Sequence, residues 1–109
     1  MLGICRAIGD IDMTTAAAFC ADLHDMIDGS DEPRVSVDCS AVTFMGPAGY
    51  HALVDATGYA VRRGRTLVIC DMSPACATLM RLYDWDRELH FEQPPPRRRG
   101  PASVSISGV

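Results

Sequence analysis

Thiols and imidazoles are the side chains of this sequence best suited to nucleophilic or metal chemistry. The five cysteines and three histidines are Cys5, Cys20, Cys39, Cys70, Cys76, His24, His51 and His90. A cysteine beside a histidine could serve as a nucleophile with its base, but His24 and His51 are expected on the polar sides of two helices, as surface residues. The cysteine count is odd, with neither a C-x-x-C pair nor zinc-finger spacing. The sequence therefore predicts buried free thiols, no metal site and no cofactor.

Three aspartates, Asp10, Asp12 and Asp38, are the carboxylates that could be imagined around a cation. Hard cations prefer oxygen ligands, but these residues lack the spacing of a calcium or magnesium cage. We expect aspartates of this kind to form turns and to be solvated.

The composition indicates one acidic domain without catalytic motifs. The chain has 109 residues, 48% of them apolar, and a net charge of −4. Proteins that follow nucleic-acid phosphates need a basic stripe, so we expect the folded part to bind no nucleic acid. No apolar run reaches the roughly 18 residues of a membrane span, and acids at Asp10 and Asp12 interrupt any signal-peptide core, so we expect a cytoplasmic protein without a membrane segment. Without a glycine-rich phosphate loop, a catalytic triad or a metal cluster, we expect no enzyme.

Hydrophobic periodicity places these residues on alternating strands and helices. Thr14 or Thr15 is expected to cap the first helix, and Pro47 to open the second. The predicted buried stripe of the second helix is Tyr50, Leu53, Val54, Thr57 and Val61. The predicted elements are strands at 2–11, 35–44, 66–70 and 85–91 and helices at 16–27, 47–63 and 74–83.

The resulting order, β-α-β-α-β-α-β, predicts an α/β domain with a mainly parallel central sheet and right-handed crossovers. This domain is expected to span residues 1–91. From residue 92 onward the composition changes, with three prolines at 94–96 and three arginines at 97–99. Such a stretch offers no apolar face to bury, so residues 92–109 are expected to form a disordered tail.

Several sequence motifs, in the same order along the chain, resemble motifs of the STAS domains of bacterial anti-sigma factor antagonists. They are G-D-I-D-M-T-T at 9–15, V-S-V-D-C-S-A-V-T-F-M at 35–45 and R-G-R-T-L-V-I at 63–69. The similarity continues through Ser73-Pro74 and Leu79 and covers residues 2–91. It implies a small α/β domain that works by binding another protein.

The resemblance also implies where that partner binds. Family members read D-S-S-G at the start of the second helix, where an ATP-binding anti-sigma factor with kinase activity docks and phosphorylates a serine. Here Gly46 stands at the acidic position and Pro47 and Ala48 stand at the two serines. The phospho-acceptor position, Ala48, has therefore lost its hydroxyl. Thr43 is the nearest candidate to replace it, and we expect that it does not.

The sequence thus predicts an anti-sigma factor antagonist-like regulator that captures its partner without the usual phosphorylation switch. Asp22 and Asp25 are predicted as charges at the rim of the binding surface. The predicted binding residues are Thr43, Met45, Gly46, Pro47, Ala48, Gly49 and His51.

Two other functions stay open. STAS-like domains also sense small ligands or nucleotides and serve as regulatory subunits of membrane transporters. A redox-gated regulator is the third reading, because Cys39 and Cys70 would end neighbouring strands if the second and third strands pair. Disulfides between adjacent strands have awkward geometry and are uncommon in the cytosol, which disfavours this reading.

Overall fold

The computed structural model describes residues 4–83 and 88–92 of the chain. Strands and helices alternate along it as β1 (Ile4–Ile11), α1 (Ala16–Gly29), β2 (Arg34–Met45), α2 (Pro47–Arg62), β3 (Thr66–Met72) and α3 (Pro74–Met80). The strands form one sheet in the order β1-β2-β3, with both pairs parallel. The predicted α/β fold with a parallel sheet is confirmed.

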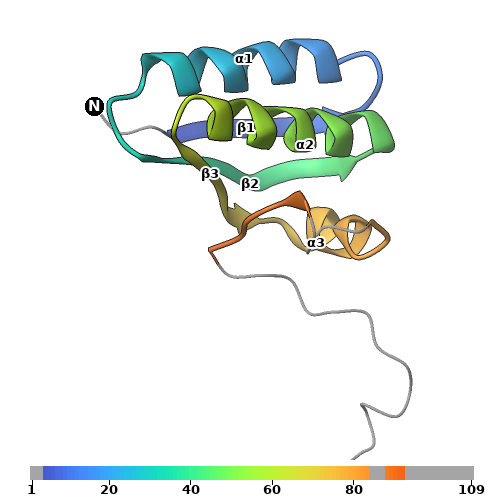
Figure 1. Cartoon of the computed structure of the whole chain (residues 1–109). Helices are drawn as coiled ribbons and strands as arrows, with labels where there is room; N and C mark the ends of the chain where they lie inside the picture. The colour runs from blue at the N-terminus through green and yellow to red at the C-terminus, as the bar shows by residue number, and fades with distance from the viewer. Residues whose placement is uncertain (1–3, 84–87, 93–109) are drawn as a thin grey trace, which may run out of the picture.

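Helices cover both faces of this sheet. Figure 1 shows α1 and α2 side by side over one face, with α3 on the other side, beneath β2 and β3. The carboxyl ends of β1 and β2 lead directly into the loop before α1 and into the start of α2. The residues expected to bind a partner therefore gather at one end of the molecule. Within the described ranges, no helix is long and apolar enough to cross a membrane.

The core follows the predicted periodicity in β2 and β3. Val35, Val37 and Cys39 are fully buried and alternate with half-buried Ser36 and Asp38. The continuous apolar run of β3 is buried along Leu67, Val68 and Ile69, as a strand covered on both faces requires. In β1 the side chains of Ala7 and Ile11 are buried, whereas Ile4 and Ile8 are exposed. Only one face of this edge strand is therefore covered by helices.

An apolar stripe of α1 is buried, and the buried stripe on α2 is broader than predicted. Phe19, Leu23 and Ile27 of α1 are buried. In α2, Val61 is 61% exposed, so its predicted place in the stripe is wrong. The helix instead buries a second row of small residues, Ala52, Ala56 and Ala60. These small side chains let α2 approach both the sheet and α1. Val61, the residue after Ala60, then faces solvent.

The turn into α1 differs in detail from the prediction. Thr15 holds the N-cap position, but its hydroxyl makes no cap hydrogen bond. It donates to the Asp10 carbonyl at 2.8 Å and accepts from the Asp12 amide at 3.0 Å. The Asp12 carboxylate organises the turn by accepting from the amide and the hydroxyl of Thr14. These bonds lower the pKa of Asp12.

In the described part of the predicted last strand, residues 88–91, a single bridge is formed. Phe91 pairs in parallel with Ile69, with the Ile69 amide donating to the His90 carbonyl and the Glu92 amide donating to the Ile69 carbonyl, each at 2.9 Å. Residues 85–87 of this predicted strand lie outside the described residues. So do residues 93–109 of the predicted tail. Its first residue, Glu92, is described, and its carboxylate lies 3.3 Å from the Arg34 guanidinium.

Candidate functional site

The start of α2 is held against the end of β1 by close backbone contacts. The Gly46 amide donates to the Ile11 carbonyl at 2.9 Å. A Cβ atom at Gly49 would stand 2.6 Å from both Ile11 Cγ2 and Met45 Sδ, which no real Cβ tolerates. Glycine at position 49 is therefore required for this approach. Pro47 occupies the first helical position, as predicted.

The predicted binding residues divide into an exposed set and a buried set. Thr43, Pro47 and His51 are exposed and Ala48 is half-buried. Met45 is fully buried, and Gly46 and Gly49 are buried as well. These three residues shape the surface from beneath, so any contribution they make to binding is indirect.

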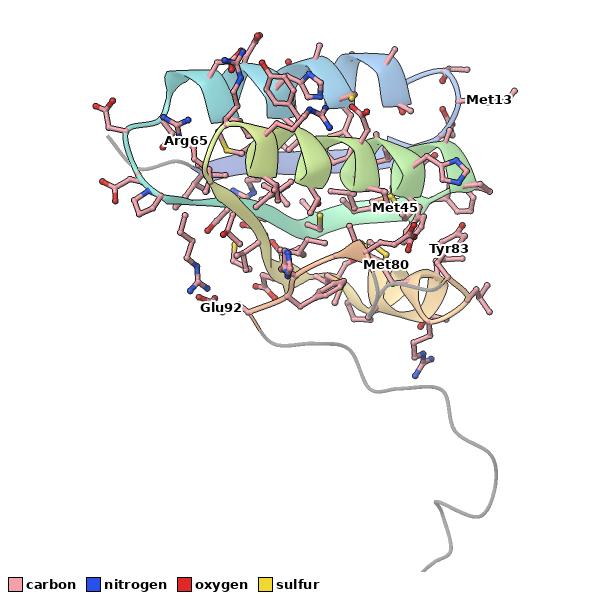
Figure 2. The ribbon with its side chains drawn as sticks, viewed as in Figure 1. Met13, Met45, Arg65, Met80, Tyr83 and Glu92 are labelled. Carbon is pink, nitrogen blue, oxygen red and sulfur yellow. The ribbon has the colours of Figure 1, made fainter. Side chains whose placement is uncertain are left out.

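Two exposed apolar side chains at this end of the molecule were missed by the sequence analysis. Met13, in the loop between β1 and α1, is 84% exposed, and Phe44, near the end of β2, is 41% exposed. Figure 2 shows Met13 projecting into solvent from that loop. The sequence did contain a signal for both residues: Met13 is an apolar residue inside a turn, and Phe44 is an apolar residue at the end of a strand. We call the exposed and half-exposed group Met13, Thr43, Phe44, Pro47, Ala48 and His51 the α2-start surface.

Thr43 is already engaged within the domain. Its hydroxyl donates to Asp10 Oδ1 at 2.5 Å, across the ends of β1 and β2. Among the described residues, positions 46 to 49 carry no hydroxyl at all. The hydroxyl nearest to them along β2 therefore serves to tie two strands together.

Two tyrosines brace the α2 start from below. The rings of Tyr50 and Tyr83 stack with centroids 4.5 Å apart, and the Tyr83 hydroxyl donates to the Met45 carbonyl at 3.3 Å (Figure 2). The Tyr50 hydroxyl donates to Glu88 at 2.8 Å. Burial raises the pKa of Tyr83, so its hydroxyl keeps its proton and remains a donor. The surface above is thus mounted on a rigid base that the sequence did not reveal.

The two predicted rim charges lie on α1. Asp22 and Asp25 are both exposed. Asp22 lines a shallow hollow between β1 and α1, together with Cys5 and Arg6. That position faces the edge of the sheet and not the start of α2.

Of the three aspartates considered for a cation, only Asp12 lies in a turn, whereas Asp10 lies in β1 and Asp38 in β2. Asp12 holds the turn before α1, and Asp10 accepts from Thr43. Asp38 accepts from the Ser40 amide at 2.9 Å, which lowers its pKa. The expectation of turn-forming aspartates is therefore confirmed for Asp12 and wrong for Asp10 and Asp38, which accept hydrogen bonds within the sheet.

The sequence predicted buried thiols, and this is confirmed for two of the five, Cys39 and Cys76, whereas Cys5, Cys20 and Cys70 are half-buried. All five cysteines are free. The thiol of Cys39 lies close to that of Cys76 on α3, and both are fully buried. Cys70 is half-buried, and its thiol donates to the Val37 carbonyl at 3.5 Å. The Cys39–Cys70 disulfide that the disfavoured redox alternative would use is not formed, and α3, packed on the sheet, brings Cys76 to Cys39.

His24 also departs from the prediction of a plain surface residue. Its side chain is 30% exposed and is stacked on Tyr59, with ring centroids 4.0 Å apart. It lies between α1 and α2, close to Cys20 and Asp55. His51 and His90 are exposed, as expected. The spacing of Cys20 and His24, four residues apart on one helix, was the available signal for this cluster; the third member required the packing of two helices.

Comparison with known proteins agrees with this architecture. Among solved structures, the chain is similar to one described as the anti-sigma factor antagonist SpoIIAA in its unphosphorylated form. The match has a TM-score of 0.64 and covers 83% of this chain and 78% of that chain, at 11% sequence identity. At this identity the likeness concerns the fold. No curated protein matches the chain.

The sequence itself matches a family model. That model is described as "Mlab, STAS domain", and the match runs over residues 5–91. Apart from Ile4, the first residue of β1, it includes every strand and helix of the described structure, and it ends at the bridge residue Phe91. The chain therefore belongs to the STAS domain family.

Proposed function

We propose that this protein is an anti-sigma factor antagonist-like regulator, which captures an ATP-binding anti-sigma factor without being switched by serine phosphorylation. Membership of the STAS family supports a regulatory, binding role. The likeness to a SpoIIAA structure described as an anti-sigma factor antagonist supports the class of partner. In this proposal the protein acts in the bacterial cytoplasm by binding, and catalyses no reaction.

The observation that carries the proposal is the α2 start, which keeps the shape of a docking surface while lacking an acceptor hydroxyl. Gly46 and Gly49 seat the helix on the end of β1. Pro47 and half-buried Ala48 occupy the positions at which the family resemblance places serines. A partner could bind this surface, but phosphoryl transfer has no oxygen to act on there.

The chemistry of the α2-start surface suits protein binding. Met13 and Phe44 add exposed apolar area at the same end of the molecule as Pro47, and interfaces are enriched in methionine and aromatic residues at their centres. The stacked tyrosine pair packs beneath this surface, and a preorganised surface loses less entropy on binding. Thr43 and His51 supply polar groups at its border.

The decisive experiment incubates the full chain with candidate ATP-binding anti-sigma factors and labelled ATP. We expect a stable complex, no label on residues 46–49, and no release of the complex by ATP. Label on Thr43 would contradict the proposed loss of the switch. Failure to bind any such factor, together with a rise in melting temperature on adding nucleotide, would favour the nucleotide-sensing alternative instead.

A further inference from the structure

Three potential metal ligands meet on the surface between α1 and α2. Cys20 and His24 lie about one turn apart on α1, and Asp55 reaches them from α2. The Cys20 thiol donates to Asp55 Oδ2 at 3.3 Å. His24 Nε2 lies 2.9 Å from the same oxygen and 3.7 Å from Cys20 Sγ. Within the described ranges, no other three side chains of these types bring their ligand atoms within 4.8 Å of one another.

This triangle has nearly the size of one face of a tetrahedral zinc site. Zinc binds sulfur at about 2.3 Å and nitrogen or oxygen at about 2.0 to 2.2 Å, so neighbouring ligand atoms are separated by roughly 3.3 to 3.6 Å. The two separations from Cys20 Sγ, 3.3 and 3.7 Å, are close to that range. The separation of His24 Nε2 from Asp55 Oδ2, at 2.9 Å, is a hydrogen bond that needs to open by about 0.4 Å on this scale. The Asp55 side chain is 55% exposed, so it is free to make that adjustment.

The arrangement differs from a Cys-His-Asp catalytic triad. In a triad the two ring nitrogens of the histidine face different partners. Here Nε2 alone faces both Cys20 and Asp55. The Cys20 thiol donates to the Asp55 carboxylate, so His24 does not act as its base. The sulfur, nitrogen and oxygen atoms converge on one point, as a metal ion requires.

Neighbouring side chains fix the imidazole in this orientation. The His24 ring stacks on Tyr59 with an interplanar angle of 5°. The Tyr59 hydroxyl in turn donates to both carboxylate oxygens of Asp28, at 2.7 and 2.8 Å, and accepts from Arg63 at 2.7 Å. Such outer partners orient the ligands of metal sites. A histidine held in this way loses little freedom when a metal binds.

We propose that Cys20, His24 and Asp55 form a zinc site that joins α1 to α2 and leaves a fourth position open to water. The Cys20 thiol gives its proton to the solvent as the S–Zn bond forms. The proton that His24 Nε2 donates to Asp55 moves by way of solvent to Nδ1, so that Nε2 of the neutral imidazole and the carboxylate bind through their lone pairs. A thiolate and a carboxylate together balance the two positive charges of Zn²⁺. Because His24 is 30% and Asp55 55% exposed, the ion and its water have access from solvent.

Cobalt titration of the full chain, kept reduced, tests this directly. Co²⁺ replaces Zn²⁺ in tetrahedral sites and reports thiolate ligation by a charge-transfer absorption. We expect one equivalent of Co²⁺ to bind with one thiolate, and one equivalent of Zn²⁺ to displace it. Zn²⁺ should also raise the melting temperature, because the ion binds the folded state.

Variants separate this site from the remaining cysteines and histidines. Cys20→Ser, His24→Gln and Asp55→Asn should each weaken binding by more than the roughly 10- to 100-fold that loss of an outer partner costs. Cys70→Ser and His90→Gln, which alter a half-buried thiol and an exposed imidazole elsewhere, should bind as the unmodified chain does. The proposal is overturned if Co²⁺ gives no thiolate absorption, or if Cys20→Ser and Asp55→Asn retain full affinity while their circular dichroism shows that they are folded.

This inference stands apart from the proposed function. Asp55 follows Pro47 by eight residues along α2, which is about 12 Å of helix at roughly 1.5 Å per residue. The cobalt titration measures metal binding, and the incubation with anti-sigma factors measures partner binding. Either experiment can therefore fail while the other succeeds.

Discussion

Gly49 faces Ile11 across so short a distance that a single added carbon atom would stand 2.6 Å from the Ile11 side chain and 2.8 Å from its carbonyl oxygen. This contact sets how closely the first turn of α2 approaches the end of β1. The same substitution would meet the Met45 sulfur at 2.6 Å. Because one of the three obstructing atoms belongs to the backbone, the clash cannot be relieved by side-chain movement alone.

Gly49→Ala should therefore lower the free energy of unfolding, by about 1 to 3 kcal/mol, as overpacking does. Gly58→Ala is a matched control in the same helix, because its added carbon meets only Arg62 Nη1 at 3.6 Å. That control should be stabilised by about 0.5 to 1 kcal/mol, since alanine suits a helix interior better than glycine. Denaturant midpoints of the two variants measure the difference. Equal denaturant midpoints for the two variants would show that the start of α2 does not pack closely against Ile11.

Ala48→Glu should weaken capture of the anti-sigma factor by tenfold or more, about 1.4 kcal/mol, because it adds bulk and charge in the α2-start surface. A glutamate in the first turn of a helix favours folding, so stability should not fall. Ala75→Glu is the control: Pro74 and Ala75 open α3 as Pro47 and Ala48 open α2, and Ala75 is exposed on the other side of the sheet (Figure 1). If both variants lost the same amount of affinity, the binding interface would not lie at the α2-start surface.

Met13→Ala should reduce binding by about fivefold or more, roughly 1 kcal/mol, while leaving stability unchanged. The side chain is 84% exposed and so contributes little to the core. Val61→Ala removes another exposed apolar side chain, at the far end of α2, and should bind normally. Affinities from calorimetry compare the pair. Unaltered binding by Met13→Ala would remove the β1-α1 loop from the surface.

The fold could be predicted from the sequence because the patterns that indicate its strands and helices are local. The continuous apolar run of β3 and the alternation around Val37 in β2 specify strands by period alone. Pro47 and Ser73 mark where two helices begin, and the Ser73 hydroxyl does accept from the Cys76 amide at 3.0 Å. Val61 was misplaced because periodicity cannot tell how wide a buried stripe becomes when a helix packs on both a sheet and a second helix.

The site could be predicted from the sequence only where its residues lie in one continuous segment. The run from Thr43 to Gly49 is continuous, so its resemblance to the family phrase could be read directly. Relationships between segments were not accessible. The contact of Cys39 with Cys76 and the approach of Asp55 to Cys20 each depend on how helices pack.

Thiol reactivity distinguishes the redox alternative. Burial and the Cys76 contact raise the pKa of Cys39, and burial raises the pKa of Cys5 and Cys70. At neutral pH these thiols stay protonated, so the native protein should react slowly with a thiol reagent. Cys39 and Cys76, which are fully buried, should be labelled only after unfolding. Rapid labelling of either one, or a Cys39–Cys70 disulfide under mild oxidation, would restore the redox reading. Mass spectrometry of the labelled peptides gives the result.

Acid should loosen the turn that leads into α1. Hydrogen bonds from Thr14 lower the pKa of Asp12 below its ordinary value of 3.8. A carboxyl with a lower pKa in the folded state stabilises folding above its unfolded pKa, and that contribution is lost as the pH falls through the folded value. Asp12→Asn should therefore be less stable than the unmodified chain near pH 7, and the difference should shrink below about pH 4. Asp31→Asn, at an exposed aspartate beyond α1, serves as the control and should follow the unmodified chain at each pH. Melting temperatures from pH 2 to 7 make the comparison, and a stability gap for Asp12→Asn that stays constant across that range would show that the carboxylate charge does not hold the turn.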